Sequence, residues 1–353
     1  MSYKIFGYLP DGRDVYAYTL SNARGMQVTI LNYGGIIQSM YVPTATGNRN
    51  VVLGYETLED YLENPPYLGA TIGRTAGRIE KGRLTIDNHM YDLTSKDQEN
   101  LLHGGEKGFH QQYMSAKEIK LPAGSQLRLS FLSKGAEEGF PGDIEMEITY
   151  QLSECDNVLK VTYIGRSTGK NYLNMTNHSY FNLLGKSQDS IRDHQLCINA
   201  SAYAQVNEAM IPSLEWTQVS GTAMDFQAFK PIDDALKSND AQIKLAGGID
   251  HPFLIQRGEH ADGLVSAAQL QSPDKEVILE VFTTQHHLVV YTGNFLQDSV
   301  VASGKKFIRN QGICFESQEK PNMVNTHPEL CKWMDQGEPY REEIEYAFYT
   351  NAH

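Results

Sequence analysis

Five short segments combine glycines and turn formers with side chains that can bind a polyol or move a proton. Residues that bind or react are found preferentially on loops held by a rigid scaffold. Together the segments supply histidines, carboxylates, arginines and amides, the residue types that proton transfer and hydroxyl binding require. In chain order they are residues 73–79, 102–105, 176–182, 247–253 and 312–318.

Glu316 is the most unusual residue of these segments, because it stands among apolar neighbours. Burying a carboxylate is costly unless it is paired or hydrogen-bonded, so a functional role and a structural role are both open. The others have ordinary structural alternatives. His103 fits a buried structural histidine, Asp250 a turn former after two glycines, and Arg78 a surface charge.

The motifs of several large enzyme classes are absent. The chain has no G-x-G-x-x-G, H-E-x-x-H or G-x-S-x-G. Gly185-Lys186-Ser187 imitates the end of a P-loop, but Tyr180 occupies the position of the required earlier glycine. His286 and His287 are adjacent and would point to opposite faces of a strand, which makes a poor chelate. The sequence therefore predicts neither a metal site nor a nucleotide cofactor.

Strands must position the five segments, because apolar and polar residues alternate along much of the chain. The clearest run is 144–152, and runs 127–131, 159–163 and 344–348 behave similarly. Successive side chains of a strand point to opposite faces, so these runs predict strands buried on one face. Run 277–282 is more uniformly apolar and predicts a strand buried on both faces.

Helical patterns are sparse. Residues 57–64 predict a short capped helix before Pro65-Pro66, and residues 232–238 predict another. Nothing alternates strands with long helices, which argues against a doubly wound α/β fold. No clear repeat, low-complexity segment or linker divides the chain. The sequence therefore predicts one all-β domain over residues 1–353, with two packed antiparallel sheets as its architecture.

The composition restricts the partners. The 353 residues carry a formal charge of −13, which repels phosphate backbones and anionic lipid. We therefore expect neither nucleic acid nor a membrane as partner. No apolar run approaches the ~18 residues of a transmembrane helix. Residues 1–10 lack the apolar run of a signal peptide. The four cysteines are far apart, and we expect free thiols in a reducing cytoplasm. Nothing in the sequence indicates an oligomeric state.

In this order and spacing, the five segments closely resemble the galactose mutarotase (aldose 1-epimerase) family. The resemblance spans nearly the whole chain, and further matching motifs are Asn32-Tyr33-Gly34-Gly35, Phe140-Pro141-Gly142, Tyr291-Thr292-Gly293-Asn294-Phe295 and the tail 337–348. It implies the large antiparallel β-sandwich of the family, the galactose mutarotase-like supersandwich. That fold agrees with the strand patterns.

The resemblance also implies an activity, the interconversion of the α and β anomers of aldohexoses such as galactose and glucose. By motif, His178 resembles the general acid and Glu316 the general base. Residues that resemble sugar ligands or line the pocket are Arg78, His103, Tyr180, Asp250 and Gln285. Ring opening and closure move only protons, so the small-molecule sugar is the one partner that the reaction needs. Glu316 suits the base if it is ionised, and His178 suits the acid if nearby carboxylates keep its pKa near or above ~6.5.

Two departures from the family pattern bear on sugar preference. Gly77 stands before Arg78, where the family often has Asn, which removes one expected hydrogen bond to the sugar. After Gly108-Phe109 the family often continues with Asp-Lys and then a Trp. This chain has His110 and Gln111, with Met114 at the place of the Trp.

Four alternatives remain open. A hexose-phosphate epimerase would need a cationic cluster for the phosphate, and none surrounds the five segments. A disaccharide mutarotase, such as a maltose epimerase, would differ in loop size. A glycosidase using Asp250 and Glu316 as its carboxylate pair would cleave glycosides. A non-catalytic carbohydrate-binding module would not need both an acid and a base, whereas His178 and Glu316 are both present. The preferred sugar stays open.

Overall fold

The computed structural model describes residues 1–353 except 95–98, 122–123, 186–188, 259–262, 336 and 352–353. Its described strands form three large sheets and four two-stranded ladders, and every strand pair within them is antiparallel. The largest sheet has nine strands, in the spatial order β11 (Ser115–Leu121), β12 (Gly124–Ser133), β13 (Ile144–Ser153), β14 (Val158–Ser167), β28 (Tyr340–Thr350), β24 (Val277–Thr283), β23 (Val265–Gln271), β18 (Gln195–Ile198) and β21 (Lys230–Pro231).

Two smaller sheets complete the sandwich. The six-stranded sheet runs β17 (Tyr180–Phe181), β26 (Ile313–Gln318), β25 (His287–Tyr291), β22 (Asp250–Ile255), β19 (Ala200–Tyr203) and β20 (Thr217–Gln218). The five-stranded sheet runs β1 (Ser2–Tyr8), β2 (Asp14–Ser21), β3 (Gln27–Leu31), β4 (Ile37–Thr44) and β5 (Gly47–Asn50).

The remaining elements are short. The two-stranded ladders pair β10 (Leu101–Leu102) with β7 (Arg78–Ile79), β15 (Asn171–Tyr172) with β27 (Trp333–Met334), β16 (Thr176–Asn177) with β6 (Thr71–Ile72), and β8 (Arg83–Ile86) with β9 (His89–Asp92). The α-helices are α1 (Leu58–Glu63), α2 (Ile232–Leu236), α3 (Ala241–Ala246) and α4 (Met323–Thr326). In the described part of the chain, no helix is both long and apolar enough to span a bilayer.

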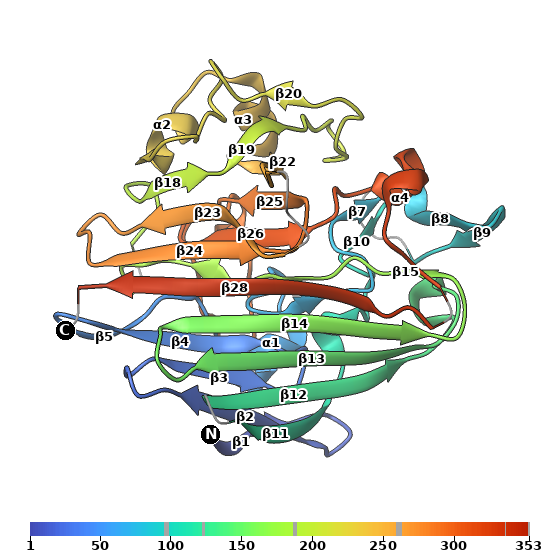
Figure 1. The fold of residues 1–353 in the computed structure, drawn as a ribbon, viewed down its shortest axis with the longest axis horizontal. Coiled ribbons are helices and arrows are strands. Elements are labelled where there is room, and N and C mark those ends of the chain that lie inside the picture. Colours follow the sequence, from blue (N-terminus) through green and yellow to red (C-terminus); the bar gives the residue numbers. More distant parts are fainter. Residues whose placement is uncertain (95–98, 122–123, 186–188, 259–262, 336, 352–353) are drawn as a thin grey trace.

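The main core lies between the nine-stranded sheet and the two smaller sheets. Figure 1 shows the long strands of the large sheet stacked across the molecule, with β1–β5 behind one part and β22, β25 and β26 behind another. The main cluster of buried apolar side chains joins all three sheets, for example Ile30, Ile148 and Phe315. The prediction of an all-β antiparallel sandwich is confirmed, with three large sheets rather than two.

Strand alternation predicted most burial patterns correctly. In β13 the even-numbered residues from Ile144 to Leu152 are buried, as expected. Run 277–282 forms β24, but the prediction that both its faces are buried is wrong: Ile278 and Phe282 are only half-buried. Ile278 pairs with Tyr349 of β28, which is 53% exposed, so this face of the sheet is partly open to water.

Both predicted helices are present. Thr57 caps α1, with its side chain accepting the Asp60 N–H. Residues 232–238 begin with α2. Helices α3 and α4 were not predicted. Helix α3 is as long as α1, and its cap residues Asp240 and Gly247 are sequence signals that could have indicated it. Helix α4 spans four residues, too few for a periodic pattern.

Candidate active site

A cavity of about 220 Å³ opens on the face of the six-stranded sheet that points away from the main core. It gathers residues from all five segments identified in the sequence. Six of the seven predicted site residues line it: Arg78, His103, His178, Tyr180, Asp250 and Glu316.

Alternation along β26 explains how Glu316 reaches the cavity. Ile313 and Phe315 point into the main core, and the next residue on the opposite face is Glu316. Gln318, two residues further, also lines the cavity, and its amide donates to Oε2 of Glu316 at 3.3 Å. A strand buried on both faces thus carries a carboxylate on one of them.

The neighbouring strands extend the same wall. In β25, Val289 lies opposite Glu316, and in β22, Asp250 lies opposite Tyr291. Phe253 of β22 points to the main core, whereas Asp250 and Tyr291 line the cavity. Asp250 is therefore on the cavity side of a paired strand, at its first residue.

His178 lies in the connection between β16 and β17. Its backbone N–H donates to the carbonyl of Ala70 at 2.9 Å, and its carbonyl accepts the Gly69 N–H at 3.0 Å. The Asn177 side chain adds a hydrogen bond to the Gly69 carbonyl at 2.9 Å. Three hydrogen bonds to one facing segment hold the backbone on which the imidazole sits.

His103 follows β10 in a turn that only glycine can complete. Gly104 has φ +83°, and a Cβ there would lie 1.9 Å from the Gly73 carbonyl oxygen. The His103 backbone N–H donates to the Gly77 carbonyl at 3.0 Å, and the Gly77 N–H donates to Nδ1 of His103 at 3.3 Å. Because Nδ1 accepts, the hydrogen of a neutral His103 is assigned to Nε2.

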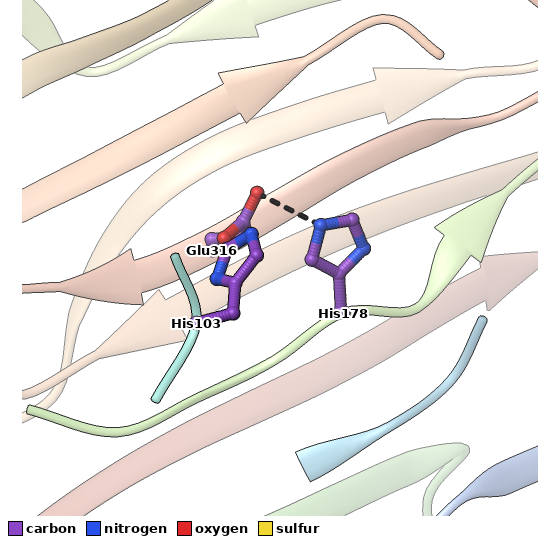
Figure 2. A group of neighbouring side chains, drawn as sticks. All are labelled: His103, His178 and Glu316. Atoms are coloured by element: carbon purple, nitrogen blue, oxygen red, sulfur yellow. Dashed lines mark ion pairs between the residues drawn. The ribbon is translucent and has the colours of Figure 1, made fainter. Parts of the chain in front are cut away.

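The closest contact between functional groups joins His178 and Glu316. His178 Nε2 lies 3.4 Å from Glu316 Oε1, and the two side chains are 5% and 4% exposed. Figure 2 shows this pair with His103 beside it; the His103 and His178 rings are 5.2 Å apart.

Burial decides the protonation of this pair. Burial and the negative charge of Asp250 raise the pKa of Glu316 to about 8, against the opposing effect of Arg78. Burial lowers the pKa of His178 to about 4. Neither condition set for the two roles is therefore met at neutral pH: burial keeps the pKa of His178 below ~6.5 and the pKa of Glu316 above 7. At neutral pH the pair holds one proton and favours its uncharged form.

Tyr180 contributes a ring face rather than a hydroxyl. Its hydroxyl donates to the Pro66 carbonyl at 3.0 Å, and its ring lies 5.0 Å from that of His178. Tyr67, which the sequence did not single out, also lines the cavity, with its ring 4.9 Å from that of His103. No sequence motif indicated Tyr67, whereas Gln318 could have been found from its spacing of two from Glu316.

Gln285 does not reach the cavity, contrary to the expectation carried over from the family pattern. It lies between the end of β24 and the start of β25, with 1% of its surface exposed. Its amide donates to the Tyr340 hydroxyl at 3.4 Å, and it lines a different cavity together with Trp216 and His286. We therefore leave Gln285 out of the site.

The departures from the family pattern have separate structural consequences. Gly77 has φ +71°, and a Cβ there would lie 2.5 Å from Pro321, so the proline ring occupies the room of a larger side chain. His110 stands behind the cavity wall, with its ring 4.8 Å from that of Tyr67. Met114 is fully buried in the main core and does not line the cavity.

His103, His178 and Glu316 also form the kind of group that can hold a metal ion, with ligand atoms within 4.8 Å of one another. A metal-bound imidazole donates its second N–H to an acceptor. The second nitrogen of His103 instead faces the Gly77 N–H, which is itself a donor. The hydrogen bonding around His103 therefore suits a neutral imidazole that donates from Nε2 into the cavity.

Comparison with known proteins agrees with this geometry. The family model for aldose 1-epimerase matches residues 16–347. The chain is 33% identical to galactose mutarotase of Sus scrofa, over 98% of this chain and 97% of that protein, and 35% identical to aldose 1-epimerase of Escherichia coli K12, over 96% of each. The crystal structure of galactose 1-epimerase from Lactobacillus acidophilus superposes with a TM-score of 0.87 at 29% identity and covers 99% of both chains. The chain belongs to the aldose 1-epimerase family.

Proposed function

We propose that this aldose 1-epimerase uses Glu316 as general base and His178 as general acid to interconvert the α and β anomers of aldohexoses. The observation that carries the assignment is the buried His178–Glu316 contact of 3.4 Å in a cavity lined by further hydroxyl-binding groups. A perturbed, mutually close acid and base in a cavity is the arrangement that proton transfer requires.

The reaction consists of two proton transfers and one bond cleavage. In the reactive form the single proton of the pair has passed from Glu316 to Nε2 of His178 across the 3.4 Å contact. Ionised Glu316 then takes the proton of the C1 hydroxyl while protonated His178 gives its proton to the ring oxygen, and the bond between C1 and the ring oxygen breaks. Rotation about C1–C2 turns the other face of the aldehyde toward the hydroxyl that was the ring oxygen. On closure the protons return, so the pair begins and ends the cycle with one proton. A pair such as this contributes about 10²–10⁴-fold for each group.

The remaining groups suit a neutral hexose. Asp250 can accept from a hydroxyl, Arg78 and His103 Nε2 can donate, and fixing the sugar in one pose supplies further rate. Arg78 is the one Arg or Lys among the described residues that line the cavity. That composition favours a sugar without phosphate. The names of the relatives support galactose, and we propose galactose and glucose as substrates.

Polarimetry tests this function. Freshly dissolved α-galactose, α-glucose and maltose are followed with and without the purified protein. We expect the two monosaccharides to reach their equilibrium rotation faster with the protein. No acceleration with any sugar would refute the proposal, and release of free sugar from a glycoside would support a glycosidase instead.

Activity is expected to survive exhaustive chelation and dialysis, because only protons move in the proposed steps. Mutarotation rates are compared before and after treatment, with metal content measured in both samples. A rate that falls on chelation and returns with one metal would overturn the cofactor-free mechanism.

Asp250→Ala is expected to lower kcat/KM about 10- to 150-fold, the value of one hydrogen bond to a charged group. Asp250→Asn serves as the matched control, since it keeps the shape and removes the charge. Because Asp250 raises the pKa of Glu316, this variant should move the basic limb of the pH profile to lower pH. An unchanged kcat/KM in both variants would make Asp250 a turn residue only.

The pH dependence of kcat/KM is expected to be bell-shaped. Activity requires one proton on the pair, so it falls below about pH 4, where His178 gains a second proton, and above about pH 8, where Glu316 loses the first. The limbs belong to the coupled pair rather than to single residues. A rate that stays constant from pH 5 to pH 10 would contradict the requirement for a single proton on the pair.

Two further parts of the proposal concern organisation and location. The main core cluster, which includes residues from Leu20 to Phe348, supports a single domain over residues 1–353. The four cysteines are free thiols, which supports a reducing compartment such as the cytoplasm.

A further inference from the structure

The second ring nitrogen of His178 contacts a buried cysteine. Sγ of Cys314 lies 3.5 Å from Nδ1 of His178, and the opposite nitrogen, Nε2, faces Glu316. Cys314 is 0% exposed. We propose that Cys314 is a positioning residue for the acid: its sulfur accepts the Nδ1 hydrogen of His178 and so keeps Nε2 for proton transfer. This inference rests on the proposed function of the same site.

The proposed cycle fixes which nitrogen must carry the hydrogen. When the sugar ring closes, Nε2 of neutral His178 has to take back the proton from the hydroxyl that the former ring oxygen carries. A neutral imidazole carries a single N–H, so at that moment its hydrogen must be on Nδ1. A histidine that works as acid and base therefore needs a third group that holds the other nitrogen.

Cys314 is the side chain in place to do so. Its Sγ lies within hydrogen-bonding distance of Nδ1, and its backbone is fixed by the pairing of β26 with β17 and β25. The carbonyl oxygen of His178 itself accepts the Gly69 N–H at 3.0 Å, and its second lone pair makes it the rival acceptor of the ring hydrogen. The Cys314 variants below separate the two acceptors, because they leave this carbonyl unchanged. The Tyr180 hydroxyl is directed to the Pro66 carbonyl.

One strand supplies both partners of the imidazole. Cys314 and Glu316 are two residues apart on β26, so they share a face and are separated by about 6.6 Å along the strand. Cys314 also pairs with Tyr180, the first residue of β17, which begins two residues after His178. The register of β17 on β26 therefore places the ring between the sulfur and the carboxyl.

A thiol has a particular effect as the orienting group. Burial and the charges of Glu316 and Asp250 raise the pKa of Cys314, so the group stays neutral. Sulfur is also a weak acceptor, and it stabilises an imidazolium less than a carboxylate would. The protonated ring therefore remains a strong acid toward the weakly basic ring oxygen. Besides Cys314, the titratable groups against His178 are Tyr67, His103, Tyr180, Tyr291 and Glu316, and Arg78 and Asp250 line the same cavity.

The tautomer can be read directly in the parent protein. Long-range ¹H–¹⁵N correlation spectra of protein labelled with ¹⁵N-histidine distinguish Nδ1–H from Nε2–H, and His178→Asn assigns the resonances. We expect neutral His178 to carry its hydrogen on Nδ1. A neutral His178 with its hydrogen on Nε2 would overturn the proposal, whatever the activity of the protein.

Two substitutions separate hydrogen bonding from packing. Cys314→Ala removes the acceptor and should lower kcat about tenfold with KM near the parental value. Cys314→Ser keeps an acceptor and should hold kcat within about threefold of the parent. Since oxygen accepts more strongly than sulfur, this variant should also move the acidic limb of the pH profile to higher pH. Cys197 lies in β18 of the nine-stranded sheet, and its Sγ donates to the Gln227 carbonyl. Its Ala and Ser variants are the matched controls and should show none of these effects.

A packing role gives the opposite pattern. Cys314→Ala would then keep the parental kcat and pH profile, and Cys314→Ser would be the poorer variant because it buries a hydroxyl. That result would overturn the proposal. If Cys314→Ala does not fold, the pH profile of Cys314→Ser and the spectrum of the parent still decide. A parent that does not accelerate mutarotation would refute the proposed function, which the spectrum does not test.

Discussion

Glu316→Gln is expected to lower kcat for mutarotation by about 10²–10⁴-fold. The amide keeps the shape of the carboxyl group but cannot take the proton of the C1 hydroxyl. Sugar binding should largely persist, because proton transfer contributes in the transition state rather than in the ground state. Polarimetry over a range of sugar concentrations measures kcat and KM separately. A near-parental kcat would make Glu316 the wrong base, and His103 or Asp250 would be the next candidate.

The same substitution has a signature in stability. A carboxyl group whose pKa rises from 4.5 to about 8 on folding binds its proton more tightly in the folded state, so stability falls as pH rises through that window. His178, with its pKa lowered from 6.5 to about 4, has the opposite slope between those two values. Between pH 6.5 and 8 Glu316 is the member of the pair that contributes a slope, and comparison with Glu316→Gln cancels the slopes of other groups, such as Glu319, whose pKa burial also raises. The Tm of the parent should fall across this interval more than the Tm of Glu316→Gln, which lacks the titrating carboxyl. A cooperative thermal transition of the variant would show at the same time that it is folded.

Alternation in the sequence predicted which residues share a strand face, but not which strands are neighbours. Along 312–318 it separates Ile313 and Phe315 from Glu316, and the structure places them on opposite faces. It carries no information on register, so nothing in the residues themselves places His178 beside a strand that begins 135 residues later at Ile313. That contact followed only from the family resemblance. The split of the smaller layer into a six-stranded and a five-stranded sheet escaped prediction for the same reason.

The motif carried over the positions of most site residues, whether they lie on strands or in connections. Arg78 and Asp250 belong to paired strands and line the cavity, and His103 and His178 line it from connections. Gln285 also stands in a connection but turns to Tyr340. The sequence could not show that the pKa of His178 is lowered, because desolvation depends on the fold. Cys314 escaped notice because a free thiol carries no motif, and its position next to Nδ1 depends on strand register.

His178→Asn is expected to lower kcat by about 10²–10⁴-fold, because the side chain stays polar but has no proton to give the ring oxygen. KM should change much less, since the interaction is made mainly in the transition state. The bell-shaped pH profile should also lose its acidic limb near pH 4, which comes from protonation of this ring. Polarimetry across pH measures both effects. If kcat remained near the parental value, the acid would have to be sought elsewhere, with His103 the nearest imidazole at 5.2 Å.

The double variant, Glu316→Gln with His178→Asn, distinguishes a coupled pair from two independent groups. If the two side chains act on one step and share one proton, losing either stops that step, so the double variant should lose less than the product of the single losses. Independent groups would give losses that multiply. The contact of 3.4 Å between Nε2 and Oε1 and the single proton that the pair holds both favour coupling. The residual rate of the double variant then comes from positioning of the sugar alone. Adding Asp250→Ala should therefore lower that rate further. If it did not, the cavity would contribute to the rate only through its acid and base.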